Sequence, residues 1–389
     1  MLNFNYRNPT HVVFGKDRMA ELDQLVPENA RVLITYGGGS VQRFGTLDKV
    51  KAALGNRTVF EFGGIEANPK YDTLMKAVEV ARAEKIDFLL AVGGGSVMDG
   101  TKFIALAITF TGDTASLLHH GFNPVPVAND KVIPLGVIAT LPATGSEMNA
   151  FAVVSYQGGK YPMNHPNVYP TFAMLDPELT FSLPKIQVAN GVVDAFVHVL
   201  EQYATYPVDA RVQDRMAEGI MRTLIEIGPI TVAEPTNYDA RANLMWSATS
   251  ALNGMIGTGV PMDWTTHMIG HELTALFNID HAQTLAAVLP SVWRVLATQK
   301  QAKLLQFAER VWDITADEGD EAYRVEQAIA KTEAFFQQVG LPTRLRDHGV
   351  TVAQIDAVID ALAAHGMTAL SETGKVDLAA SRQILEMAW

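Results

Sequence analysis

Histidine and carboxylate side chains occur at helical spacing in the second half of the sequence. Asp194 and His198 are four residues apart, and His267 and His271 repeat that spacing. Residues four apart share one face of a helix, so each pair can direct its side chains to one point. His281 follows a segment typical of a turn, Asn-Ile-Asp, and we expect it to open a new helix. The pattern can build a closed metal site from one carboxylate and three imidazoles.

This set of side chains favours zinc or ferrous iron. Imidazole and carboxylate bind both ions and are poor together for magnesium or calcium. A single histidine is more often a core or capping residue than a ligand. Asp194 is harder to explain in that way, because it lies in the apolar stretch 192–197, where a carboxylate has to be paired or bound to an ion. The joint pattern predicts one divalent metal per chain, Fe2+ or Zn2+.

The first half of the sequence contains two short apolar runs that each end in three glycines and a serine. One leads into Gly37, Gly38, Gly39 and Ser40, and the other into Gly93, Gly94, Gly95 and Ser96. A buried strand, a glycine turn and a helix N-terminus can bind phosphate, because backbone N–H groups point at the anion and missing side chains let it approach. Neither copy is the G-x-G-x-x-G fingerprint, and one such turn alone is more often only a turn. Two copies favour a dinucleotide.

Length, charge and composition limit the class of protein. The 389 residues suffice for two domains, with 48% hydrophobic and 19% charged residues. The net charge is −12 and we find no basic run, so we expect no nucleic acid and no anionic membrane as a partner. The chain has no cysteine, no signal-peptide pattern and no apolar stretch of spanning length. We expect a cytoplasmic protein.

The character of the sequence changes near Pro184. Before it, strand-like runs at 32–36, 58–62, 88–92, 132–139 and 171–175 alternate with helical patterns such as 71–85 and 99–108. After it, helical periodicity alone continues, at 187–206, 209–227, 239–254, 264–277, 282–298, 303–314, 322–339 and 352–364. The first pattern is typical of parallel β-α units. We therefore predict an α/β, Rossmann-like nucleotide-binding domain at 1–183 and an all-helical domain at 184–389, with a cleft between them that brings a nucleotide beside a metal.

Four motifs of the chain resemble the iron-dependent (group III) alcohol dehydrogenases, which have a dehydroquinate-synthase-like fold. They are Gly191–His198 followed by Glu201, His267–His271 followed by His281, Gly93–Asp99, and Thr144–Glu147. The resemblance runs nearly from end to end. Within the family, it is strongest to the butanol dehydrogenases and to the broad-range NADPH-dependent aldehyde reductases of bacteria.

This resemblance implies a role for particular residues. The metal ligands it implies are Asp194, His198, His267 and His281, with His271 a catalytic residue outside the ligand set, beside the cofactor and the reactive centre. The nucleotide-binding residues it implies are the turn Gly93–Ser96 and Asp99 for the pyrophosphate and its ribose, Asn68 near the phosphates, and Thr140, Thr144 and Lys160 beside the nicotinamide half. A lysine in a Gly-Gly-Lys-Tyr loop is otherwise usually only solvated.

The first glycine turn indicates which nicotinamide cofactor is used. NAD-preferring members of the family often place an acidic residue in this loop, where it takes the ribose 2′-hydroxyl. Here the loop is Gly37–Ser40, with no carboxylate to repel a 2′-phosphate. Backbone N–H groups and a serine hydroxyl can accept that phosphate. We expect NADP(H), although a plain tight turn would tolerate both cofactors.

The chemistry that we predict is hydride transfer between NADP(H) and small, largely apolar aldehydes and primary alcohols. The metal would act as a Lewis acid, and the proton would come from solvent or through His271, unless His271 only bonds a helix neighbour. Trp264, three residues before His267, would line the substrate pocket or pack in the core. Other apolar residues expected near the ligands are Phe196, Trp246, Met255, Met262 and Phe277.

Two other readings remain open. A dehydroquinate-synthase-like or glycerol-dehydrogenase-like enzyme would use NAD and a divalent metal, and the synthase would need several cations for a substrate phosphate. A nucleotide-binding sensor would not need four intact ligands. The segment Met1–Gly15 alternates polar and apolar residues and could pair with another copy of the chain, so we expect a homodimer.

Overall fold

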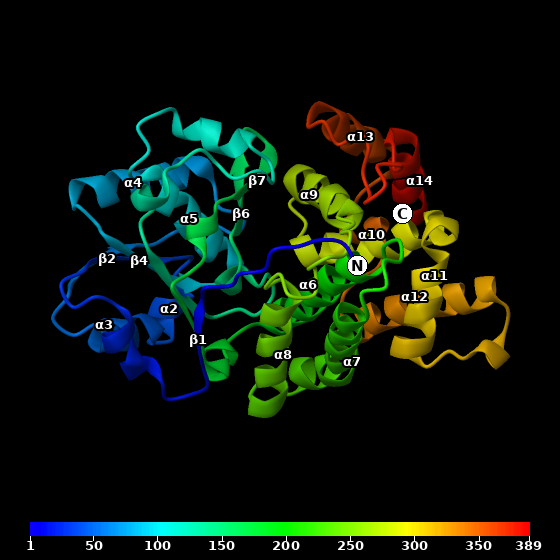
Figure 1. Ribbon diagram of the computed structural model, residues 1–389, viewed down its shortest axis with the longest axis horizontal. Coiled ribbons are helices and arrows are strands. Elements are labelled where there is room, and N and C mark those ends of the chain that lie inside the picture. Colours follow the sequence, from blue (N-terminus) through cyan, green and yellow to red (C-terminus); the bar gives the residue numbers. More distant parts are fainter. The chain divides into compact units, whose positions relative to one another are not determined.

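The computed structural model describes residues 1–389, which divide into two compact units (Figure 1). The α/β unit consists of Arg7–Leu183 and Pro235–Thr249. The helical unit consists of Met1–Tyr6, Pro184–Glu234 and Ser250–Trp389.

The main division lies at Pro184, but two segments depart from the domain ranges 1–183 and 184–389. Met1–Tyr6 belongs to the helical unit, where the N–H of Leu2 donates to the carbonyl of Gly259 at 2.8 Å. Pro235–Thr249 belongs to the α/β unit, where the buried Arg241 donates to the carbonyl of Thr180 at 2.7 Å. Hydrophobic periodicity identifies a helix but not the core that the helix joins, and the sequence expectation fails here for that reason.

A six-stranded parallel sheet forms the centre of the α/β unit. Its order is β1 (His11–Phe14), β8 (Phe172–Leu175), β5 (Leu135–Ala139), β4 (Phe88–Gly93), β2 (Arg31–Tyr36) and β3 (Thr58–Phe62). All neighbouring strands are parallel. Five strands match the predicted runs, and β1 is an additional edge strand that pairs with β8 of the same chain.

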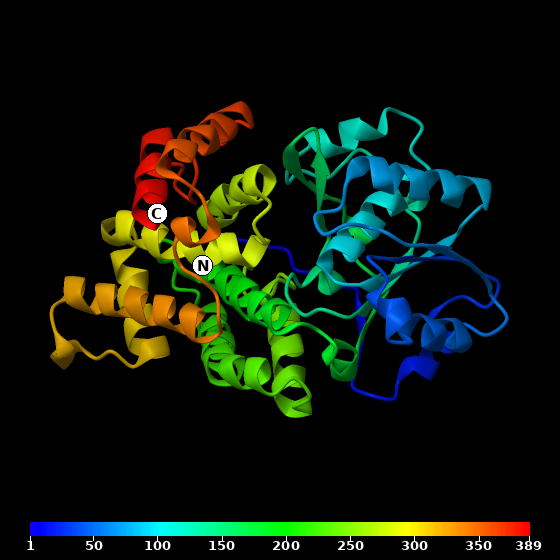
Figure 2. The ribbon, with the colours of Figure 1, turned by 180° about the vertical axis from the view of Figure 1, so that it is seen from behind.

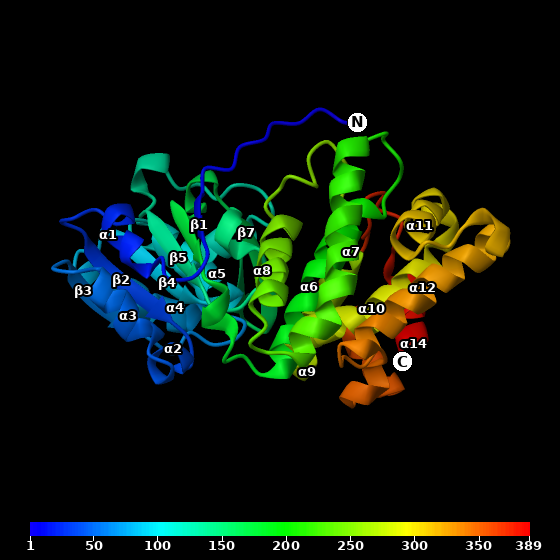
Figure 3. The same cartoon turned by 90° about the horizontal axis from the view of Figure 1, so that it is seen from below.

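Helices cover both faces of this sheet (Figure 3). Successive residues of a strand point to opposite faces. Accordingly, Leu33 packs into the core with α4 (Tyr71–Ala83) and α5 (Gly95–Ala107), whereas Val32 and Ile34 pack with the short helices between β1 and β3. Those short helices are α1 (Leu22–Leu25), α2 (Ser40–Arg43) and α3 (Thr46–Ala53). The two apolar faces confirm the α/β class.

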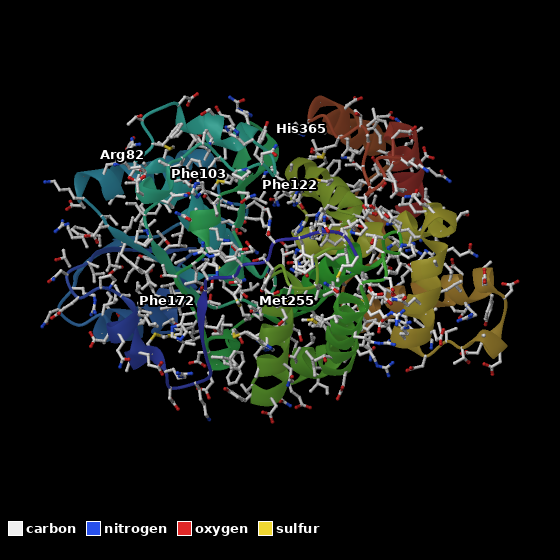
Figure 4. All side chains as sticks on the ribbon, viewed as in Figure 1. Arg82, Phe103, Phe122, Phe172, Met255 and His365 are labelled. Carbon is white, nitrogen blue, oxygen red and sulfur yellow. The ribbon has the colours of Figure 1, made fainter.

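One glycine of the sheet is required by close packing. A Cβ at Gly136 on β5 would lie 2.2 Å from the ring of Phe172 on β8. That ring stacks on Phe88, with the ring centroids 6.2 Å apart (Figure 4). The missing side chain therefore lets an aromatic ring lie across the middle of the sheet.

A separate hairpin, which the sequence analysis does not predict, follows β5. It pairs β6 (Phe151–Tyr156) with β7 (Gly159–Asn164) in antiparallel register. The turn residues Gln157 and Gly158 have φ of 47° and 83°, as a two-residue type I′ turn requires. Lys160 therefore lies on a strand, not in a loop.

The helical unit contains no strand, as predicted (Figure 2). Its helices are α6 (Lys185–Tyr203), α7 (Arg211–Ala233), α9 (Thr265–Phe277), α10 (His281–Val295), α11 (Ala297–Trp312), α12 (Glu321–Gln338), α13 (Ile355–Ala364) and α14 (Leu378–Ala388). Most of α8 (Tyr238–Ala251) belongs to the α/β unit, and α14 was not among the predicted helices. From Val188 onward α6 is buried throughout, and it packs against α7 and α10. None of the helices combines the length and apolar character needed to cross a membrane.

Candidate functional site

The metal-binding candidates lie on three helices of the helical unit. Asp194 and His198 are on the buried helix α6, and His267 is on α9. His281 is the first residue of α10, as predicted. The left-handed residue Asn278, with φ of 54°, ends α9 and turns the chain toward α10. Helical spacing thus places Asp194 with His198 and His267 with His271, and the turn after α9 places His281.

Asp194 lies at the centre of this cluster. Its Oδ1 atom is 3.9 Å from Nε2 of His198, 4.0 Å from Nε2 of His267 and 3.8 Å from Nε2 of His281. These separations are too long for hydrogen bonds. Four ligands at about 2.1 Å from a tetrahedral ion lie about 3.4 Å from one another, so the arrangement needs only a small contraction to share one ion.

Burial and protonation also fit a metal ligand set. Oδ1 of Asp194 is buried without a hydrogen-bond partner, a costly condition for a carboxylate oxygen. Burial lowers the pKa of His198 to about 4, so this imidazole is neutral at neutral pH and keeps a lone pair for an ion. The ligand atoms of Asp194, His267 and His281 all lie within 4.8 Å of one another. The residues present therefore fit a divalent ion.

Close helix packing brings His281 to the cluster. A Cβ at Gly270 on α9 would lie 2.7 Å from Oγ1 of Thr284 on α10, so the glycine allows the two helices to approach. The side chain of Asn190 on α6 donates to Asp280, the residue before His281, at 3.0 Å. Both contacts fix the start of α10 relative to its neighbours.

His271 and Trp264 border the ligands. The His271 ring is 5.0 Å from that of His281 and 6.3 Å from that of His267, between ring centroids. The Trp264 ring meets the ring of His267 edge-on at 5.3 Å and that of His198 at 6.3 Å. Both side chains therefore lie beside the predicted ligands, and the roles of His271 and Trp264 stay predictions.

Some apolar residues expected at the ligands lie elsewhere. Phe196 is fully buried and packs against Phe335 and Phe336 in the helical core. Trp246 belongs to the α/β unit and contacts Phe14. A residue that is close to a ligand in the sequence need not contact that ligand, because neighbouring residues on a helix point in different directions.

Glu201 is a functional candidate that ends the motif around Asp194 and His198, where its residue type and position predicted no role. Its carboxylate contacts Nδ1 of His267 on the side away from Asp194. Burial raises the pKa of Glu201 well above its ordinary value, and the nearby Asp263 adds to this, while backbone N–H donors lower it. The spacing of Asp194, His198 and Glu201, four and then three residues, was the available signal.

The two glycine turns lie side by side in the α/β unit. They follow β2 and β4, which are adjacent strands paired through Tyr36 and Val92. The chain runs from β2 to β3 on one side and then returns to β4 on the other, so this is the switch point of the sheet. Nucleotides bind at the carboxyl ends of strands at such a point.

The second glycine turn leads directly into α5. This helix begins at Gly95 rather than at the predicted residue 99. A Cβ at Gly93 would lie 2.6 Å from Val97, and one at Gly95 would lie 2.5 Å from Thr144. The N–H of Thr140 donates to the carbonyl of Gly93 at 3.0 Å. The structure thus brings Thr140 and Thr144 to the start of α5, and side chains at these glycines would collide with their neighbours.

Asn68, Ser96 and Lys160 form a connected group at the same place. The N–H of Asn68 donates to Oγ of Ser96 at 3.2 Å, and Nζ of Lys160 donates to Oδ1 of Asn68 at 2.9 Å. Asn68 has a positive φ of 58°. The three predicted nucleotide-binding residues therefore lie together, with a cation among them.

Asp99 connects α5 to the segment after β5. Its two carboxylate oxygens accept hydrogen bonds from Oγ of Ser146 at 2.6 Å and from the N–H of Val153 at 2.9 Å. Lys102, one helical turn later, is fully buried and donates to Ser146, Asn149 and Phe151. Burial lowers the pKa of Lys102 to about 8, against the attraction of Asp99 and Glu147. Lys102 was missed, since a lysine on a helix normally indicates a solvated face.

The first turn is more open. Gly37 is restricted, because its Cβ would lie 3.2 Å from the carbonyl of Ile65, whereas Gly38 has nothing within 4 Å. Gly39 has φ of 91° and precedes α2, which begins at Ser40. Backbone N–H groups and one hydroxyl are therefore the polar groups that this turn offers.

Two models of one protein family match the chain, one in each half. A model described as iron-containing alcohol dehydrogenase matches residues 9–177, and a model of the C-terminal part of the Fe-containing alcohol dehydrogenase family matches residues 188–387. The chain belongs to this family. It is an oxidoreductase of the alcohol dehydrogenase type, which confirms the resemblance seen in the four motifs.

Individual relatives agree over the whole length. The chain is 55% identical over 392 residues to the NADPH-dependent aldehyde reductase YqhD of Escherichia coli, covering 100% of both. It is 39% identical over 372 residues to the probable NADH-dependent butanol dehydrogenase 1 of Bacillus subtilis, covering 94% of this chain and 95% of the relative. A crystal structure of E. coli YqhD matches with a TM-score of 0.97 and 55% identity, covering 100% of this chain and 99% of that chain. The fold, α/β followed by helical, is confirmed.

Proposed function

We propose that this enzyme is an NADP(H)-dependent alcohol dehydrogenase that reduces small, largely apolar aldehydes and oxidises the corresponding primary alcohols. The observation that carries the proposal is the cluster in which Asp194 faces His198, His267 and His281. The family chemistry is exchange of hydride between a nicotinamide and the carbon of an alcohol, for which the protein supplies binding and orientation.

We propose that this cluster holds one divalent ion, Fe2+ or Zn2+. When bound, such an ion supplies Lewis-acid polarisation of a carbonyl oxygen. Asp194 contributes the one negative charge of the set, and the imidazoles are neutral ligands. The site therefore keeps a net positive charge, which favours an oxygen that gains negative charge during reduction.

We assign to His271 the exchange of a proton with the substrate oxygen, with solvent as the alternative donor. The His271 ring lies beside that of His281, at the edge of the cluster. Imidazole exchanges protons readily near neutral pH, which suits it to this role.

We propose that the two glycine turns bind the cofactor, with NADP(H) preferred over NAD(H). At the second turn, the N-terminus of α5 and the Asn68–Ser96–Lys160 group offer donors and a positive charge to the pyrophosphate. At the first turn, Gly37–Ser40 presents no carboxylate to a 2′-phosphate. The 55% identical relative is named as NADPH-dependent, whereas relatives of 40% and 39% identity are named as NADP-dependent and NADH-dependent, respectively.

We also infer a homodimer. The strand β1 lies at the edge of the sheet and is paired only with β8, so its other edge can accept a strand from a second copy. The mass of the protein in solution, measured by light scattering, tests this inference, and a monomer at micromolar concentration would contradict it.

A steady-state assay tests the main proposal. The purified chain is loaded with iron or zinc and given butanal with NADPH or NADH. We expect aldehyde-dependent oxidation of NADPH that exceeds that of NADH and disappears when a chelator removes the metal. A metal-loaded protein that oxidises neither cofactor with any straight-chain aldehyde would contradict the proposal.

A further inference from the structure

Glu201 is a buried carboxylate on α6 that contacts a predicted metal ligand from behind. Its side chain is 3% exposed, and Oε2 contacts Nδ1 of His267. Oε1 accepts a hydrogen bond from the N–H of Thr266 at 2.6 Å and another from the N–H of His267 at 3.3 Å. Both oxygens are therefore used as acceptors by the first turn of α9.

We propose that Glu201 is a positioning residue that holds the proton of His267 on Nδ1 and thereby directs the Nε2 lone pair to the metal. The inference rests on the proposed metal-binding role of the cluster. An imidazole that binds a metal through one nitrogen carries a hydrogen on the other, and a carboxylate partner there fixes both the ring orientation and the protonation. Nε2 of His267 is the atom that faces Asp194, and Nδ1 is the atom that faces Glu201.

The geometry requires a carboxylate at this position rather than any acceptor. One oxygen serves two backbone N–H groups, and the other serves the ring N–H. A glutamine has a single acceptor oxygen. If that oxygen stays on the backbone groups, the amide NH2 faces Nδ1, which must then accept, and the ring proton moves to Nε2, where the metal would bind. If the amide rotates, its NH2 opposes the two backbone donors.

A buried network fixes the backbone around Glu201. Asp263, whose N–H donates to the carbonyl of Glu201 at 2.8 Å, accepts from the N–H of Thr265, the first residue of α9, at 2.8 Å. The other oxygen of Asp263 pairs with the buried Lys300 at 2.9 Å, and Lys300 also pairs with Glu372 at 3.1 Å. Because these contacts hold the start of α9, the backbone of His267 is fixed beside the carboxylate of Glu201, and the orientation of the ring is left to that carboxylate.

The chain contains a matched control for this arrangement. Glu272 on α9 is also a buried carboxylate, and its Oε1 is 2.7 Å from Nδ1 of His365 (Figure 4). His365 is not one of the four predicted ligands. Substitution of Glu272 thus changes the same chemical pair in the same unit without touching a ligand of the ion.

The experiment compares Glu201→Gln with Glu272→Gln in the full-length chain. Zn2+ affinity is measured by competition with a chromophoric chelator, and melting temperature is measured with and without Zn2+. We expect Glu201→Gln to weaken Zn2+ binding by about 10- to 100-fold, the usual effect of losing such a partner. Its metal-free melting temperature should stay close to that of the wild type, because a glutamine satisfies every hydrogen bond when the ring proton is on Nε2. The absorption bands of the Co2+-loaded variant should also change.

Several outcomes would overturn the proposal. Wild-type Zn2+ affinity in Glu201→Gln would do so, as would an equal loss of affinity in Glu272→Gln, which would indicate a general effect on the fold. A crystal structure of the Zn2+-loaded wild type gives a test that needs no variant. There, Nε2 of His267 on the ion and Glu201 on Nδ1 are expected, and ligation by Nδ1 or by Glu201 itself would contradict the proposal. Because these readouts require no turnover, a failed aldehyde assay would refute the proposed function alone.

Discussion

The glycine turns of the α/β unit and the metal cluster of the helical unit are built in opposite ways. The turns offer backbone N–H groups, and their conformation depends on absent side chains, as the collisions at Gly93 and Gly95 show. The cluster offers side-chain atoms, and Asp194 works only if histidines from other helices reach it. The first site is therefore damaged by adding atoms, and the second by removing them.

The largest effect is expected when a ligand of the cluster is removed. His281→Ala takes away one imidazole, and the remaining three side chains cannot close a four-ligand site. We expect metal content, measured by elemental analysis, to fall well below one per chain and turnover to be abolished. Full metal content together with wild-type activity would show that the ligand assignment is wrong.

The neighbouring histidine provides the control for that prediction. His271→Ala also removes an imidazole from the edge of the cluster, but not one that faces Asp194. Metal content should stay near one per chain while the rate falls. Loss of the metal in this variant would place His271 among the ligands.

Adding one carbon to the second glycine turn should weaken cofactor binding without loss of metal. The new Cβ of Gly95→Ala would lie 2.5 Å from Thr144, so the start of α5 must move. An overpacking cost of about 1–3 kcal/mol corresponds to roughly a 5- to 150-fold rise in the dissociation constant if it falls on the bound state. Fluorescence titration with NADPH measures it.

A glycine-to-alanine substitution in the helical unit serves as the control for Gly95→Ala. Gly219→Ala on α7 places a Cβ with nothing within 4 Å and should leave NADPH affinity unchanged. If Gly95→Ala binds NADPH as the wild type does, the second turn is not the pyrophosphate site.

Adding a charge to the first turn should alter cofactor preference. Gly39→Asp brings a carboxylate to the position expected for the 2′-phosphate, so like charges would oppose each other. We expect kcat/KM for NADPH to fall by about tenfold, with that for NADH little changed. Gly39→Asn is the neutral control, and it also reports the cost of a side chain at a φ of 91°. An equal effect in both variants would remove the electrostatic basis of the NADP(H) assignment.

The smallest effect is expected at Trp264, which touches the ligands without binding an ion. Trp264→Ala removes the ring that lies 5.3 Å from that of His267. We expect retained metal and a shift of preference among straight-chain aldehydes toward longer ones, by several-fold in kcat/KM. An unchanged chain-length profile would make Trp264 a core residue only.

Periodicity in the sequence predicted most of the fold, and its failures have local causes. Five parallel strands and the helices from α6 to α13 follow from strand-like apolar runs and from helical patterns. The strands β6 and β7 escaped prediction, because they are short or half-exposed and lack a long apolar run. The strand β1 lies within Met1–Gly15, the segment expected to pair with another copy, but it pairs with β8 of the same chain. The helix α14 was also missed.

Prediction of the site was also partial. The spacing of Asp194 with His198 and of His267 with His271 identified two helical pairs, because four residues make about one helical turn. The role of Glu201 was missed, although it lies three residues after His198 and close to the same helix face, since a glutamate on a helix is usually solvated. Lys102 was missed for the same reason, and only its burial shows that it belongs to the interior.

The sequence by itself determined which residues are able to bind a metal or a nucleotide, because residue type and local spacing decide which atoms share a helix face or a turn. Tertiary structure alone decided which of them meet. His281 reaches Asp194 through the close approach of α9 and α10 at Gly270, and the two glycine turns become neighbours only because β2 and β4 pair at the switch point of the sheet. Contacts between residues far apart in the chain depend on packing and strand order, which local patterns do not encode.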